Sequence, residues 1–196
     1  MSTGLKIGLV ILGIIVLFAG CGGCGYNSIV NSELGVDEAW ANVQTQYQRR
    51  ADLIPNLVST IKGSGEFEQS TLMGVIEARS KATSINLTTN DLTPENLQKY
   101  EAAQNELSSS LSRLLVTVER YPDLKTTKAY QDLMVTLEGA ENRITKARQD
   151  FNAAVKNYNS NVRTFPKNLL AGMFGFQPKP SFQAKEGSEN VPEVQF

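Results

Sequence analysis

Apolar residues recur every seventh position along much of the chain, from residue 36 to residue 165. A sustained seven-residue repeat is typical of α-helices that supercoil in a left-handed sense against their neighbours. The longest series is interleaved with small or aliphatic residues, which would let facing helices interdigitate. The pattern therefore predicts an elongated antiparallel bundle of long helices. The first series is Trp40, Tyr47, Ile54 and Ile61, and the second is Val36, Val43 and Leu57, with Arg50 at the remaining position. The third and longest series is Tyr130, Leu137, Ile144, Phe151, Tyr158 and Phe165, and Leu133, Ala140, Ala147 and Ala154 lie between its members.

Turn and capping residues divide this pattern into four expected helices. Gly63-Ser64-Gly65 would end the first helix, and Thr93 followed by Pro94 is a strong start signal for the third. The second helix would bury Leu72, Val75, Ile76 and Ala82. We expect helices from Ser32 or Gly35 to Lys62, over 66–83, from Pro94 to Tyr121, and from Thr126 or Thr127 to Arg163.

The N-terminus carries an uncharged apolar run over residues 7–25. At about 1.5 Å per residue this run would extend roughly 28 Å as a helix, close to the thickness of the hydrocarbon core. We expect a single membrane-spanning helix. The alternative is a lipoprotein signal, with lipidation of Cys21 after the sequence Leu17-Phe18-Ala19-Gly20.

The expected organisation has three parts. Residues 1–25 form the anchor, residues 26–165 a helical bundle, and residues 166–196 a mostly irregular tail rich in proline and polar residues. Lys6 precedes the apolar run, and no further Lys or Arg occurs before Arg49, so the positive-inside rule places the bundle outside the cytoplasm, in the periplasm. An apolar patch in the tail would cover the end of the bundle or bind a partner: Leu169, Leu170, Met173, Phe174 and Phe176.

Composition narrows the function classes. Charged residues make up 20% of the 196 residues and the net charge is −1, which argues against nucleic-acid binding. The absence of histidine removes the commonest general base and metal ligand. No phosphate-binding glycine loop and no metal-ligand spacing occurs, so we expect neither a cofactor nor an enzyme.

Several segments resemble the LemA family, and they follow the family order over nearly the whole chain. They include QYQRRADLIPNLVSTIKG at 46–63, EAR at 77–79, ERYPDLK at 119–125 and ENRITKARQDFNAAVKNYN at 141–159. The resemblance implies a membrane-anchored protein whose soluble part is a long helical bundle. It implies no catalytic mechanism.

Two residues interrupt the first bundle helix. Arg50 occupies a position where the repeat requires an apolar side chain, and a buried arginine needs a carboxylate partner. Glu141 is the preferred partner, with Asp52, Glu77 and Glu119 as alternatives. The charge would fix helix register, or it would bind a ligand or partner.

Pro55 is the second interruption. It would kink a continuous helix by removing the hydrogen bond to the Ala51 carbonyl, or Asp52 would cap a fresh helical segment that contains Pro55 in its first turn.

We expect a non-enzymatic, membrane-anchored helical scaffold of the bacterial cell envelope that self-associates or recruits another membrane protein. The alternatives are an adaptor in an envelope signalling or stress pathway and a self-assembling coat that shapes the membrane. The expected partners are the lipid bilayer through residues 7–25, further copies of the chain and another membrane protein. The candidate structural or interaction residues are Arg49, Arg50, Asp52, Pro55, Asn56, Glu119, Tyr121, Pro122, Glu141, Asn142, Arg143 and Arg148.

Overall fold

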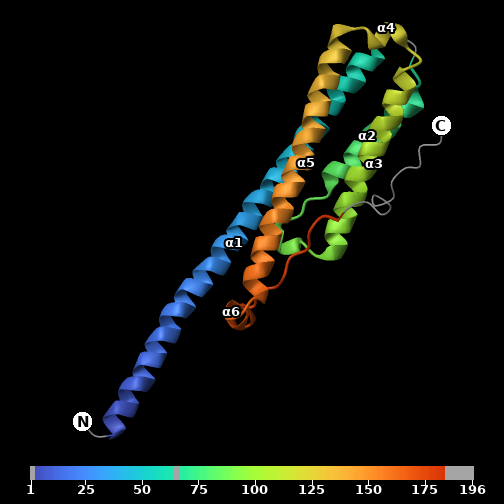
Figure 1. The fold of residues 1–196 in the computed structure, drawn as a ribbon. Helices are drawn as coiled ribbons and strands as arrows, with labels where there is room; N and C mark the ends of the chain where they lie inside the picture. Colours follow the sequence, from blue (N-terminus) through green and yellow to red (C-terminus); the bar gives the residue numbers. More distant parts are fainter. Residues whose placement is uncertain (1–2, 64–66, 184–196) are drawn as a thin grey trace, which may run out of the picture.

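The computed structural model describes residues 3–63 and 67–183, apart from the side chains of residues 3 and 5–22. All the regular secondary structure in this part of the chain is helical, and it holds no strand. The helices form an elongated bundle from which the first helix protrudes (Figure 1). They are α1 (Thr3–Lys62), α2 (Gln69–Ser84), the 3₁₀ turn η1 (Thr89–Asp91), α3 (Pro94–Val118), α4 (Pro122–Lys125), α5 (Lys128–Arg163) and α6 (Lys167–Phe174).

α1 is one uninterrupted helix of 60 residues. The predicted helix start near Ser32 or Gly35 is therefore wrong. Ile29 and Val36 are fully buried on the face that continues the seven-residue repeat, so tertiary packing holds the helix across Gly35. The boundary predicted between residues 25 and 26 consequently falls inside a continuous helix.

Within the described residues, no helix combines the length and the apolar character that crossing a bilayer requires. The predicted span over residues 7–25 falls almost entirely on residues 5–22, whose side chains lie outside the described part. The predicted lipidation site, Cys21, also lies there. Cys24 is described and is an exposed free thiol.

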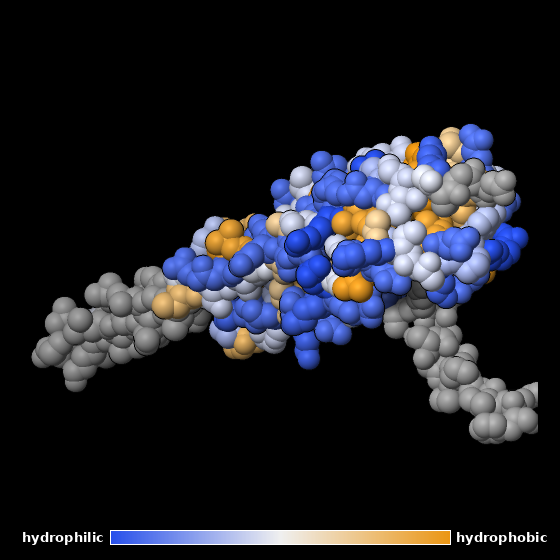
Figure 2. Space-filling model, turned by 90° about the horizontal axis from the view of Figure 1, so that it is seen from above, coloured by the Kyte–Doolittle hydropathy of each residue, from blue (hydrophilic) through white to orange (hydrophobic). Residues whose placement is uncertain are grey.

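Long antiparallel helices pack in two pairs, α1 with α5 and α2 with α3 (Figure 1). The face drawn in Figure 2 is mostly hydrophilic, with small hydrophobic patches. The seven-residue repeat correctly predicts the core positions of α1 and α5, because most of its large residues are buried between the helices. These are Val36, Trp40, Val43, Tyr47, Ile54, Leu57 and Ile61 on α1, and Tyr130, Leu137, Ile144, Phe151 and Tyr158 on α5.

Two predicted core positions are wrong. Phe165 is 79% exposed because α5 ends at Arg163, and the extended Thr164 takes the chain out of the helical repeat. Ile76 is 38% exposed, and the buried face of α2 instead includes Ala78.

The tail is more regular than predicted, since α6 forms directly after Pro166. Gly175 ends the helix at φ 79°, a left-handed conformation that glycine adopts without steric cost. Leu170 and Phe176 pack against the core, whereas Leu169, Met173 and Phe174 remain exposed. Part of the apolar patch thus covers the bundle, as one of the two predictions had it, and binding of a partner stays a prediction. Residues 184–196 lie outside the described part.

The chain after α6 runs along α5 and is fastened there by two asparagines. Asn159 accepts from the Lys179 amide and donates to its carbonyl, at 2.9 and 2.8 Å. Asn152 makes the same pair of bonds to Phe182, at 2.9 and 3.0 Å. Seven helical residues rise about 10 Å, and three extended steps cover about the same distance, so the two spacings match.

Replacing both Asn152 and Asn159 with alanine should release this segment. Four hydrogen bonds would be lost, each worth about 1 kcal/mol. We expect amide hydrogen exchange at Lys179 and Phe182 to accelerate strongly while exchange in α2 and α3 stays unchanged. Unchanged exchange at Lys179 and Phe182 would show that side-chain packing alone holds the segment.

Candidate functional site between the helix pairs

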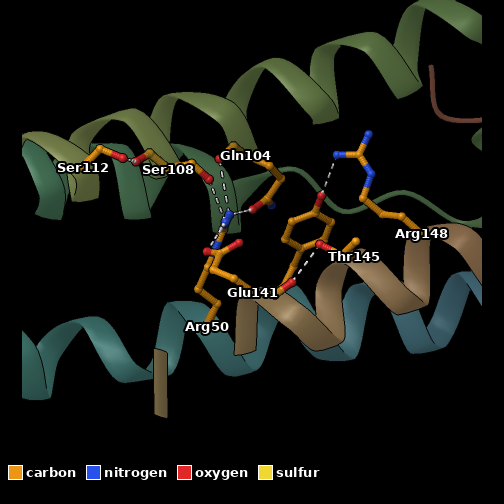
Figure 3. Close-up of polar contacts among 8 residues, drawn as sticks. Arg50, Gln104, Ser108, Ser112, Glu141, Thr145 and Arg148 are labelled. Carbon is orange, nitrogen blue, oxygen red and sulfur yellow. Dashed lines mark hydrogen bonds and ion pairs between the residues drawn. The ribbon is translucent and has the colours of Figure 1, made fainter. Parts of the chain in front are cut away.

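Arg50 is the most deeply buried charged residue of the described chain, at 1% exposure. Its guanidinium donates to Glu141 Oε1 at 2.9 Å, to Ser108 Oγ at 2.8 Å and to Gln104 Oε1 at 2.7 Å (Figure 3). A longer bond reaches the Gln104 carbonyl at 3.3 Å. The arginine therefore joins α1 to both α3 and α5.

These polar groups form a layer across the bundle. Arg50 follows Tyr47 and precedes Ile54, Gln104 lies between Tyr100 and Leu107, and Glu141 lies between Leu137 and Ile144. In each helix, the two apolar neighbours belong to different hydrophobic clusters. The layer thus separates the cluster nearer α6 from the cluster nearer α4. A polar layer at one level fixes the axial register of the helices, because any slip would place its charge against apolar side chains.

The preferred partner of Arg50 is confirmed. Glu141 makes the ion pair, while the three alternative carboxylates pair elsewhere: Asp52 with Arg79, Glu77 with Lys81, and Glu119 with Lys125. The Glu141 side chain is 44% exposed, so water solvates the outer part of the carboxylate. The pair therefore lies at the floor of an open groove.

A second charged pair borders this groove. Arg148 on α5 pairs with Glu101 on α3 and reaches the Tyr47 hydroxyl at 3.5 Å. The groove has a volume of about 620 Å³ and extends to Phe182, which stacks against the Arg148 guanidinium at 4.3 Å. Both arginines are held by carboxylates, and no group of three or more metal-ligating side chains occurs in the described chain. The geometry is suited to holding helices together.

Arg79 explains how α1 accommodates Pro55. Proline has no amide hydrogen, so the Ala51 carbonyl one turn earlier lacks its helical donor. The Arg79 Nε of α2 donates to this carbonyl at 2.8 Å. α1 remains continuous through Pro55, so the interpretation in which Asp52 caps a fresh segment is wrong. The carbonyl left free by Pro55 thus accepts a hydrogen bond that attaches α2 to α1.

Burial raises the pKa of several tyrosines, two of which lie between the helix pairs. Burial raises the pKa of Tyr47, although the nearby Arg148 and Arg50 oppose the shift. Burial also raises the pKa of Tyr100, whose ring lies 5.5 Å from that of Tyr47. On α5, burial together with Glu33 and Asp37 raises the pKa of Tyr158 to about 12.

These shifts predict alkaline destabilisation. An unfolded tyrosine loses its proton near pH 10, whereas the folded chain retains it, so the free energy of unfolding should be constant below that pH and fall above it. The expected slope is about 1.4 kcal/mol per pH unit for each buried tyrosine. Urea unfolding at pH 9 to 11.5 measures it, and Tyr100→Phe should give a shallower slope. Equal slopes in both proteins would contradict the role given to Tyr100.

The other predicted site residues do not join the polar layer. Arg49, Asn56, Asn142 and Arg143 are exposed on α1 and α5. The remaining three, Glu119, Tyr121 and Pro122, lie at the α3–α4 turn, where Tyr121 packs against Phe67 with ring centroids 5.1 Å apart. They shape the end of the bundle and lie apart from the groove.

Sequence reasoning missed four polar residues that complete the site: Arg79, Glu101, Gln104 and Ser108. Gln104 carried a detectable signal, since it occupies an inward position between Tyr100 and Leu107 just as Arg50 does on α1. Arg79, Glu101 and Ser108 face the groove or the α1 backbone only because of the orientation of α2 and α3 about their own axes. Local spacing does not determine that rotation.

The fold and this polar layer define an all-helical protein of long antiparallel helices, extended at one end by its first helix. The LemA family model matches residues 39–196, and the chain belongs to the LemA family. The predicted resemblance is thereby confirmed.

Several relatives carry individual names. Magnetosome proteins MamQ 2 and MamQ 1 of Paramagnetospirillum magneticum are each 26% identical over 181 residues, covering 84% of this chain and 66% of theirs. Protein LemA of Metamycoplasma hominis is 24% identical over 160 residues, covering 82% of this chain and 69% of its own. The chain thus spans slightly less than two thirds of each of these MamQ proteins.

Proposed function

We propose that this protein is a non-enzymatic helical scaffold of the bacterial cell envelope, anchored in the membrane by residues 7–25 with the bundle on the periplasmic side. It self-associates or recruits another membrane protein. The observation that carries the proposal is the continuity of α1, which extends from residue 3 to residue 62. A single helix would transmit the position and orientation of the anchor directly to the bundle.

The use of the polar residues supports a structural function. Arg50, Arg79 and Arg148 each bind groups on another helix of the same chain. The uncharged sequence of residues 7–25 has the composition and length of a membrane anchor. Three relatives are named as magnetosome proteins. The adaptor and the membrane-shaping coat are the alternatives for the present chain.

Self-association can be measured on the full chain in detergent by size-exclusion chromatography with light scattering. We expect a protein mass of at least twice the 21.5 kDa of one chain. A monomer at micromolar concentration would refute self-association and favour the adaptor. Flotation of the full chain with lipid vesicles tests anchoring, and the intact mass distinguishes the two anchors, since a retained Met1 excludes lipidation of Cys21.

A further inference from the structure

The most exposed apolar side chains near one end of the bundle lie on and beside α6. Phe165 and Met173 are 79% and 78% exposed, and Leu169 and Phe174 are 59% and 58% exposed. Leu169 and Met173 are four residues apart on α6 and share one face of it, with Phe174 beside them. The apolar stripe is made up of these three residues and of Phe165, which lies in the turn just before the helix. A cluster of this kind indicates an interaction surface.

A second side of α6, which Phe174 borders, is fixed to α1. Leu170 lies so close to Gly25 that a Cβ at this glycine would be 2.7 Å from Leu170 Cδ1. Phe174 packs edge-on against Tyr26 at 4.8 Å, and Lys167 Nζ donates to Ser28 Oγ at 2.8 Å. The contacts hold α6 beside residues 25–28, so the apolar stripe cannot turn inward without breaking them.

This attachment point coincides with the end of the apolar run of α1. Residues 7–25 are uncharged, and α6 contacts α1 at and just after Gly25. Figure 1 shows α6 at the end of the bundle from which α1 continues toward the N-terminus. If residues 7–25 cross the bilayer, α6 lies at the height of its surface. Tyr26 is at the same height, where aromatic side chains are common in membrane proteins.

We propose that α6 is an interfacial membrane helix, whose stripe of Phe165, Leu169, Met173 and Phe174 enters the outer part of the bilayer beside α1. This inference rests on the anchoring proposed above. Four exposed side chains offer a few hundred Å², whereas a stable protein interface needs about 800 Å² from each partner. A lipid surface requires no such area, because about 5–10 Å of immersion already removes the stripe from water.

The charge distribution determines the kind of lipid contact. The Lys167 ammonium is occupied by Ser28 and by Asn161, and Lys179 pairs with Glu33. The partners of Lys167 are neutral, so its charge remains, and Arg163 is exposed close to Phe165. Two cations make a small basic surface, so apolar burial supplies most of the attraction. The contact should form on zwitterionic phosphatidylcholine and resist added salt, unlike that of a basic amphipathic helix.

Bromolipid quenching tests the proposal on the full chain in phosphatidylcholine vesicles. Phe165→Trp places a fluorophore in the stripe with little change in its apolar character. Val135→Trp is the matched control, since Val135 is also highly exposed, at 71%, but lies near the α4 end of the bundle. We expect bromolipids to quench the tryptophan added at position 165 roughly twofold, and neither the control nor the buried Trp40. Adding Leu169→Ser and Met173→Ser to Phe165→Trp should abolish most of the quenching.

The two proposals fail in distinguishable ways. If the protein does not float with the vesicles, the anchoring is refuted and this inference with it. If the protein floats but bromolipids leave Phe165→Trp as bright as Val135→Trp, α6 lies away from the bilayer and only the present inference is overturned.

Discussion

Arg50→Ala should lower the free energy of unfolding of the bundle by about 3–5 kcal/mol. The substitution removes one of the largest fully buried side chains and leaves a cavity between α1, α3 and α5. It also deprives the buried Gln104 Oε1 of its donor. Chemical unfolding of the full chain in detergent, followed by far-ultraviolet circular dichroism, measures the loss.

The neighbouring arginine provides the matched control. Arg49 is exposed, so Arg49→Ala should change the free energy of unfolding by no more than about 0.5 kcal/mol. Glu141→Gln should cost about 1 kcal/mol, because the amide oxygen can still accept from Arg50 and the side chain is 44% exposed. Equal effects of Arg50→Ala and Arg49→Ala would refute the structural role of the buried charge.

Phe151→Ala should lower the free energy of unfolding by about 3–5 kcal/mol. Phe151 is fully buried, and its ring lies 5.3 Å from both Trp40 and Phe182. The truncation would leave a void where α1, α5 and the C-terminal segment meet. Thermal unfolding should show a lower melting temperature, and amide exchange at Phe182 should rise because its ring loses the contact with Phe151.

Phe165→Ala tests whether the effect of a truncation depends on burial or on the position in the seven-residue repeat. Phe151 and Phe165 occupy equivalent positions of the seven-residue repeat, but Phe165 is 79% exposed. Its truncation should therefore change the free energy of unfolding of the bundle by less than about 0.5 kcal/mol in detergent. A loss as large as that of Phe151→Ala would show that the repeat continues past Arg163.

The sequence predicts the core of the bundle well because helical periodicity is a local property. The seven-residue repeat places Trp40, Tyr47 and Phe151 in the core, and the same repeat identifies Arg50 as a buried charge. Electrostatics then limits its partner to a carboxylate, which is confirmed at Glu141. α6 could also have been predicted, since Pro166 and Gly175 frame it with the usual start and stop residues.

Other features depend on tertiary structure and could not be read from spacing. The Ala51 carbonyl finds its donor 28 positions away, at Arg79, only because α2 folds back along α1. The continuity of α1 through Gly35 also depends on packing, since glycine disfavours a helix by about 1 kcal/mol when it stands alone. The exposure of Ile76 likewise reflects how α2 rotates against α3.

The most direct test of the scaffold replaces the buried ion pair with apolar residues of similar length, Arg50→Met together with Glu141→Met. Such exchanges are often tolerated because the cost of desolvating two charges disappears with them. If the pair acts only within the bundle, the variant should fold, although less stably because Gln104 Oε1 loses its donor, float with vesicles and show the same mass as the wild type by light scattering in detergent. A variant that folds normally but has a reduced mass would show instead that Arg50 and Glu141 form a binding site.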